Sequence, residues 1–345
     1  MELGGDFELD ATKLRDVDDH IFDYLGSYDT IYTDSGRSAI RLLNTVLPKG
    51  KILLPAYICE SVIKEFRENY DIEFYGINLD FTIDLDDLTA KIAKQVDVFY
   101  LMHYFGTLQT EHVLDLLKEK KQESGFVIVE DTTHSIFTSP RTVGDYCICS
   151  LRKWFPVLDG GVLYASTELP ISDKELSFKQ PSKRLDAMIL KKWYINGQLD
   201  CNTLYRTIFS EEEHRLGEQT DIYKMSLLSQ AILKGISISE ICTKRRQNYE
   251  EAARFLSDKK MKPALMIDDF VPLTFPVYVT DRDMFRKYLI EHQIYCAVHW
   301  PLEGTELEGN SDAEWISDHI LSLPIDQRYG VSHLKYLKSV IDGYE

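Results

Sequence analysis

The sequence predicts an α/β protein with a mostly parallel sheet in a large domain and a smaller C-terminal α/β domain. From about residue 30 to residue 165, short apolar runs alternate with amphipathic segments, at the spacing of parallel strands joined by crossover helices. A second alternating pattern occupies the last part of the 345-residue chain. We therefore expect a large domain over residues 1–240 and a small one over residues 241–345.

The first region alternates between the two types of element. Helices are expected over residues 37–47, 61–68 and 112–121, with another opening at 84–88, and strands over 52–54, 72–75, 98–102, 126–129, 146–149 and 162–164. In parallel sheets, ligands gather at the carboxyl ends of the strands. His103, Asp131 and Ser150 all fall at such ends.

The rest of the chain divides into an irregular part and a second regular part. Residues 167–223 are rich in charge and are expected to be irregular, either a lid or a solvated surface insertion. Residues 225–256 are expected to be mostly helical, with a break near Gly235. Beyond them we expect strands over 275–279 and 294–298, and helices over 282–291, 313–321 and 333–341.

Composition excludes several classes of function. The chain has 39 basic and 56 acidic side chains, a net charge of −17, which argues against a general nucleic-acid or anionic-membrane surface. The first residues lack the basic and then apolar pattern of a signal peptide. No apolar run approaches the roughly eighteen residues of a membrane helix. We therefore expect a soluble, cytoplasmic protein with no nucleic-acid or membrane partner.

A lysine and an aspartate at predicted strand ends point to one chemistry. Lys153 lies on a tight loop between two apolar runs, and Asp131 ends the run over residues 126–130. Pyridoxal phosphate chemistry needs such a pair, because the lysine forms a Schiff base with the cofactor and the aspartate keeps the pyridine nitrogen protonated. Asp131 has a competing explanation as a helix cap or turn residue, since two threonines follow it.

Gly36 permits a sharp turn directly before a predicted helix. The free N–H groups of that helix are suited to a phosphate group, although ordinary capping explains the same residues. His103 and His134 follow apolar runs, where a lone histidine is more often structural than catalytic. We expect no metal, because no set of His, Cys and carboxylate residues has ligand spacing. Glycine motifs for nucleotides and the G-x-S-x-G serine motif are also missing.

A series of short motifs extends, in order, over almost the whole chain. These are 35–40 (SGRSAI), 103–106 (HYFG), 130–134 (EDTTH), 144–150 (GDYCICS), 159–162 (DGGV), 223–225 (YKM), 244–249 (KRRQNY), 298–301 (VHWP) and 321–324 (LSLP). They resemble the motifs of the DegT/DnrJ/EryC1/StrS family of pyridoxal phosphate-dependent sugar aminotransferases. The resemblance implies the fold of aspartate aminotransferase, fold type I of the pyridoxal phosphate enzymes.

The resemblance also implies roles for individual residues. Lys153 and Asp131 would be the catalytic pair, and both would contact pyridoxal 5′-phosphate. The other cofactor-binding residues would be Gly36, Arg37, Ser38, Tyr57, His103, His134 and Ser150, and the substrate-binding residues would be His299 and Trp300.

Three positions depart from the family pattern. The loop between Ser150 and Lys153 is two residues shorter than in most members. Ile222 stands where the family has an asparagine that reaches the phosphate of a neighbouring subunit. Cys59 replaces an aromatic residue that often covers the cofactor ring, and Tyr57 is expected to take its place.

The activity implied by the resemblance is an amino transfer. Glutamate or glutamine would donate the amino group to a keto group of a nucleotide-linked sugar in polysaccharide or secondary-metabolite biosynthesis, in a homodimer with shared active sites. Two alternatives stay open. One is a lyase or dehydratase of the same fold, although the family's dehydratases have histidine in place of the lysine. The other is a non-catalytic regulatory relative.

Overall fold

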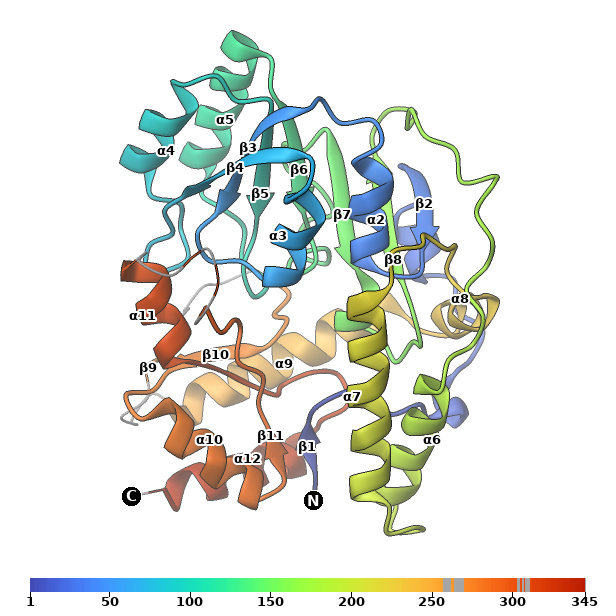
Figure 1. The fold of residues 1–345 in the computed structure, drawn as a ribbon. Coiled ribbons are helices and arrows are strands. Elements are labelled where there is room, and N and C mark those ends of the chain that lie inside the picture. The colour runs from blue at the N-terminus through green and yellow to red at the C-terminus, as the bar shows by residue number, and fades with distance from the viewer. Residues whose placement is uncertain (257–261, 264–269, 303–304, 306, 308–310, 345) are drawn as a thin grey trace. The chain divides into compact units, whose positions relative to one another are not determined.

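The computed structural model describes residues 1–256, 262–263, 270–302, 305, 307 and 311–344. Within these residues, a large sheet has the order β2 (Asp29–Thr33), β8 (Gly161–Ala165), β7 (Tyr146–Ser150), β6 (Val127–Asp131), β5 (Val98–Met102), β3 (Gly50–Pro55) and β4 (Tyr70–Tyr75) (Figure 1). This mostly parallel sheet, with helices between its strands, confirms the predicted α/β class. No helix in the described part of the chain is long and apolar enough to span a membrane.

The chain divides into two compact units, neither of which is one continuous segment. Unit 1 consists of residues 1–5, 47–147 and 241–345, and unit 2 of residues 6–46 and 148–240. The boundary between Glu240 and Ile241 is also the predicted domain boundary. We did not predict the grouping of residues 47–147 with residues 241–345, and the large and small domains themselves stay a prediction.

Parallel strands form the first part of unit 1. β3 pairs in parallel with both β4 and β5, and β5 pairs in parallel with β6. The connecting helices are α3 (Glu60–Phe66), α4 (Leu85–Ile92) and α5 (Glu111–Ser124). Asp84 caps α4 by accepting two backbone N–H groups at 3.1 Å, and Gly125 ends α5 with a left-handed φ of 76°. The register sets Met102 opposite Asp131, so β5 and β6 end together.

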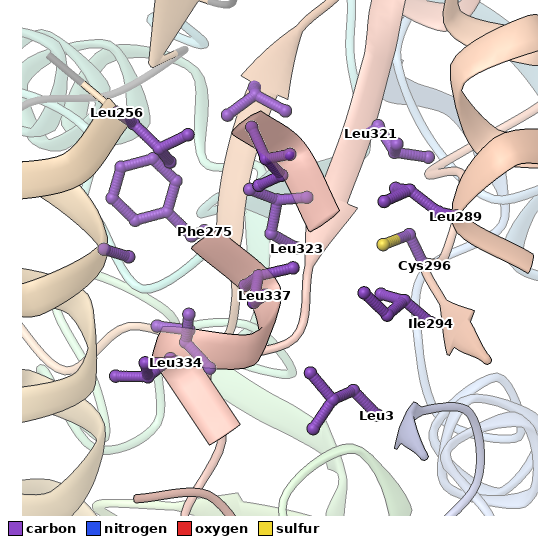
Figure 2. Packing of buried hydrophobic residues seen from close by; sticks show 14 of the residues in the cluster. Leu3, Leu256, Phe275, Leu289, Ile294, Cys296, Leu321, Leu323, Leu334 and Leu337 are labelled. Atoms are coloured by element: carbon purple, nitrogen blue, oxygen red, sulfur yellow. The ribbon is translucent and has the colours of Figure 1, made fainter. Parts of the chain in front are cut away.

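A second, antiparallel sheet lies in the later part of unit 1. β10 (Phe275–Tyr278) pairs with β9 (Lys262–Pro263) and with β12 (Ile320–Leu323). Around it lie α9 (Ile238–Leu256), α10 (Arg282–Glu291), α11 (Ser311–His319) and α12 (Val331–Asp342). Figure 2 shows Phe275 of β10 and Leu323 of β12 among the buried apolar side chains of this region. β1 (Leu3–Gly4) pairs in parallel with β11 (Ile294–Tyr295).

One predicted helix ends earlier than expected. The pattern predicted a helix over 313–321, but α11 ends at His319 and β12 begins at Ile320. Leu321 and Leu323 are fully buried and lie opposite Val277 and Phe275 of β10. A continuous apolar run suits either structure, and here pairing with β10 decides for the strand.

Unit 2 combines an antiparallel strand pair with helices. β2 pairs with β8, and the helices are α1 (Ile21–Tyr24), α2 (Gly36–Leu43), α6 (Arg184–Ile195), α7 (Asn202–Glu218) and α8 (Leu227–Lys234). Residues 167–223 were expected to be irregular, and that expectation is wrong because they contain α6 and α7. These two helices pack against each other as a hairpin (Figure 1).

Candidate functional site

Asp131 ends β6 as a buried carboxylate held by two donors. The hydroxyl of Tyr100, on β5, donates to Oδ2 at 2.8 Å, and the backbone N–H of Thr133 donates to Oδ1 at 2.8 Å. Burial raises the pKa of Asp131 above its ordinary value, while the hydrogen bonds from Thr133 and Tyr100 oppose that rise. A carboxylate can accept about four hydrogen bonds, so the orientation is fixed while each oxygen keeps capacity for a ligand.

Tyr100 was not among the predicted site residues, although the period of a strand could have indicated it. Tyr100 and Met102 share one face of β5, and the register sets Met102 opposite Asp131. The tyrosine therefore lies on the face of β5 that corresponds to the face of Asp131 on β6. A polar atom inside a run of otherwise apolar strand residues is the signal that we did not use.

Replacing Tyr100 by phenylalanine is expected to raise the pKa of Asp131 further, because Oδ2 loses its donor while burial remains. Carboxyl ¹³C NMR of aspartate-labelled protein would follow this titration. The matched control is Tyr75→Phe, which removes a buried hydroxyl that donates to the backbone carbonyl of Tyr100 at 2.8 Å. An equal shift in both variants, or no shift in Tyr100→Phe, would contradict the assignment.

His103 and Glu130 form a fully buried pair beside this carboxylate. His103 Nε2 lies 3.1 Å from Oε1 of Glu130, and His103 Nδ1 accepts the backbone N–H of Gln109 at 3.0 Å. The acceptor role of Nδ1 makes Nε2 the protonated nitrogen, which donates to Glu130. Both ring nitrogens thus have protein partners, so a cofactor would have to meet the ring carbons of His103. The predicted contact with a cofactor stays a prediction.

Glu130 also anchors the loop before β7. Its carboxylate accepts the backbone N–H groups of Thr142, Val143 and Gly144, the last at 2.7 Å. Burial alone would raise the pKa of Glu130, but the hydrogen bond from His103, together with the loop N–H groups, outweighs it and lowers the pKa. Glu130 is therefore a charged structural residue.

Glu130→Gln is expected to destabilise the protein by about 3 kcal/mol at neutral pH, because the amide cannot accept all of these donors. The folded pKa of Glu130 lies below its ordinary value of 4.5, so its contribution is complete above that value. The contribution is lost as pH falls through the lower, folded-state pKa. Urea unfolding of the variant and wild type at pH 7 and in acid should show that the gap between their free energies of unfolding becomes smaller in acid. Exposed Glu119→Gln is the control, and a gap that does not depend on pH would refute this account.

The ring of Trp300 contacts the rings of other predicted site residues within unit 1. Its ring lies 5.4 Å from the ring of His134, nearly parallel at 21°, and 5.2 Å from the ring of Tyr57. His299 contacts His134 edge-on at 5.5 Å, and its Nδ1 lies 2.8 Å from Oγ of Ser322. Residues predicted separately for the cofactor and the substrate thus share one aromatic cluster.

In unit 2, the start of α2 has the form of an anion site. A Cβ on Gly36 would lie 3.2 Å from Cβ of Ser150, so glycine lets the turn pack against the end of β7. Oγ of Ser35 caps the helix by accepting the N–H of Ser38 at 3.1 Å. In the part of the chain that the structure describes, the N–H groups of Gly36 and Arg37 have no acceptor. Such a helix terminus attracts phosphate.

Lys153 closes η2 (Leu151–Lys153), a single 3₁₀ turn after β7. Its side chain is exposed, whereas Leu151 is buried. Arg152 donates to Glu213, on α7, at 2.5 Å, and Arg37 donates to the same carboxylate at 2.8 Å. Glu213 therefore ties the lysine turn to the start of α2.

The charge of Glu213 is secured by these arginines. Burial would raise its pKa, but attraction to Arg152 and the hydrogen bond from it, together with the charges of Arg37 and Arg184, lower the pKa to about 2. Sequence analysis missed Glu213 because residues 167–223 were expected to lack helices. Lys153 belongs to unit 2 and Asp131 to unit 1.

Comparisons with known proteins place the fold. No family model and no curated protein matches the chain. Among solved structures, it is similar to a DegT DnrJ EryC1 StrS aminotransferase from Brucella abortus, with a TM-score of 0.65 and 16% identity over 94% of this chain and 87% of that one.

Two further solved structures are similar to the chain over most of its length. A sugar aminotransferase from Micromonospora echinospora has a TM-score of 0.63 and 16% identity, over 91% of this chain and 87% of the other. NtdA from Bacillus subtilis, with bound cofactor PMP, has a TM-score of 0.65 and 16% identity, over 93% of this chain and 74% of the other. The chain therefore has the fold of the DegT/DnrJ/EryC1/StrS aminotransferases, the fold type I of pyridoxal phosphate enzymes that its motifs predicted.

Proposed function

We propose that the chain is a pyridoxal phosphate-dependent aminotransferase that acts on a keto sugar. The observation that carries the proposal is the pairing, on this fold, of an exposed lysine after β7 with a buried carboxylate at the end of β6. Among solved structures with this fold, one is a sugar aminotransferase and another holds PMP. These neighbours support the cofactor and the type of substrate.

The residues present fit the cofactor. The open N–H groups at the start of α2, close to Ser150, suit its phosphate, and Asp131 has acceptor capacity for a protonated ring nitrogen. Lys153 would supply the amine that holds the aldehyde carbon of the cofactor, with release of water. When bound, pyridoxal phosphate provides an electron sink that stabilises negative charge on the carbon that loses a proton.

The side chains of this protein would then hold and move protons. Asp131, held by Tyr100 and Thr133, keeps the ring nitrogen protonated through its negative charge. The amine of Lys153 would serve as the group that takes a proton from the α-carbon of the amino donor and later gives it back. Tyr57 and His134, both packed on Trp300, are proposed to line the ring, and His299 and Trp300 to meet the acceptor.

The finer parts of the proposal follow the family resemblance. Glutamate or glutamine is the proposed donor, and a nucleotide-linked sugar is the proposed acceptor, in polysaccharide or secondary-metabolite biosynthesis. The protein is proposed to be cytoplasmic and to act as a homodimer. Ile222 and the short turn before Lys153 are where its phosphate contacts would differ from those of the family.

Spectroscopy of the purified chain with pyridoxal phosphate tests this function. We expect a visible absorbance band of the bound cofactor, which disappears when glutamate is added while 2-oxoglutarate is released. A protein that binds no pyridoxal phosphate would refute the proposal. Binding without reaction with any amino donor would favour the regulatory alternative. Sedimentation of the same sample tests the homodimer.

A further inference from the structure

One face of α7, in unit 2, continues from buried rings into a carboxylate that the proposed reaction does not use. Tyr205 and Phe209 are the buried residues of this helix, four positions apart. Glu213 lies four positions further, so it continues the same face. A charged residue therefore stands where the helix packs on the rest of unit 2, and it needs partners of opposite charge there.

The two oxygens of the Glu213 carboxylate bind two different segments of unit 2. Oε1 accepts from Arg37, in the first turn of α2, at 2.8 Å, and Oε2 accepts from Arg152, in η2, at 2.5 Å. The guanidinium of Arg37 also lies beside Gly217, one turn further along α7, where a Cβ would be 3.6 Å from Nη1. A single side chain thus restrains both segments, each through its own oxygen.

Stability alone does not account for this bridge. The side chain of Glu213 is 52% exposed, and ion pairs that remain in contact with solvent add little to stability. The turn of η2 also has anchors of its own, because Leu151 and Trp154 are fully buried and the N–H of Leu151 donates to the carbonyl of Gly160 at 3.0 Å. What the bridge adds is a fixed position of Arg152 relative to Arg37.

Both bridged segments belong to the proposed cofactor site. The start of α2 offers the N–H groups of Gly36 and Arg37 to a phosphate, and Lys153 directly follows Arg152 in η2. Pyridoxal phosphate would be held at its phosphate while the lysine amine joins its aldehyde carbon, with release of water. Such a bond forms fast only where the protein fixes the separation of the two reacting groups.

We propose that Glu213 is a positioning residue that sets the separation between the phosphate site at the start of α2 and the amine of Lys153. It acts through Arg37 and Arg152 and has no direct role toward the cofactor. This inference rests on the proposed function. Electrostatics alone predicts the opposite effect of Glu213, because a carboxylate near the start of a helix disfavours the binding of a phosphate dianion there.

The rate of cofactor capture by the full chain, first freed of cofactor, tests the proposal. The visible absorbance band is followed after addition of pyridoxal phosphate, or of pyridoxal, which lacks the phosphate. In Glu213→Gln the amide oxygen can accept from one arginine, but its NH2 group cannot accept from the other. We expect this variant to capture pyridoxal phosphate roughly tenfold more slowly and pyridoxal less than about twofold more slowly, since only pyridoxal phosphate is held at its phosphate.

A second variant and a matched control complete the test. Arg152→Met breaks the same bridge from its other side, so it should slow the capture of pyridoxal phosphate selectively, and adding Glu213→Gln to it should slow capture no further. Glu211→Gln, at an exposed glutamate of the same helix, should leave both rates unchanged.

Three results would overturn the proposal: equal slowing with both compounds, additive effects of the two variants, or capture of pyridoxal phosphate by Glu213→Gln at or above the wild-type rate. If the wild-type protein captures the cofactor normally, any of these results contradicts the role of Glu213 alone. If the wild-type protein captures no pyridoxal phosphate, the proposed function and this inference are both wrong.

Discussion

Lys153→Ala is expected to abolish amino transfer and the covalent retention of the cofactor. The variant lacks the amine that we propose both to join the cofactor and to move the proton. We expect the rate to fall by roughly 10⁴-fold or more. The side chain is exposed on a one-turn helix, so the fold should tolerate its removal.

Borohydride reduction separates this result from a general loss of structure. Reduced wild-type protein should carry the cofactor's mass on the peptide that contains Lys153, whereas the variant should carry none. Lys183→Ala, at another exposed lysine of unit 2, is the control and should keep both the mass and the activity. If the mass is found on a different lysine, the assignment of Lys153 is wrong.

Asp131→Asn is expected to lower the transfer rate by roughly 10²–10³-fold, as removal of one preorganised electrostatic partner commonly does. The amide keeps nearly the same shape, and its oxygen can still accept from Thr133 while its NH2 group donates to the hydroxyl oxygen of Tyr100, but it carries no charge to hold the ring nitrogen protonated. Activity should therefore fall while the cofactor remains bound through Lys153.

Although Asp131→Asn is expected to be less active than the wild-type protein, we expect it to be more stable. Burial raises the pKa of Asp131, so its negative charge opposes folding at every pH above that raised pKa, and the cost vanishes below its ordinary value of 3.8. Thermal unfolding without cofactor at pH 7 should give a higher Tm for Asp131→Asn than for wild type, with the difference fading in acid. A variant that is both inactive and less stable would indicate a structural role instead.

The parallel strands were predictable because each one coincides with a short run of mostly apolar residues in the sequence. The run over residues 98–102 has no polar side-chain atom apart from the Tyr100 hydroxyl and became β5 with those bounds, since all five of its residues are buried. The positions of Asp131 at the end of β6 and of Lys153 shortly after β7 follow from the apolar runs before them, whereas their roles stay a prediction. The helix over 282–291 also matched its prediction.

The helices of residues 167–223 could not be predicted in the same way. α6 buries Arg184 and Lys191, both bound to Asp6, and a search for apolar periodicity counts such residues as solvent-facing. α7 is 17 residues long but buries only Tyr205 and Phe209. Glu213 lies on α7 and binds Arg37 and Arg152, so its role appears only once distant segments are brought together.

The pairing of β1 with β11 sets an order on the protein's assembly during synthesis. Leu3 is almost fully buried and lies opposite Ile294, and the N–H of Gly4 donates to the hydroxyl of Tyr329 at 2.7 Å. Ribosomes add about 5–20 residues per second, so Leu3 waits roughly 15–60 s for its strand partner to be made. Until β11 has been synthesised, the side chain of Leu3 lacks the partner strand beside which it is buried. The residues of β1 therefore reach their final place only after β11 has been synthesised.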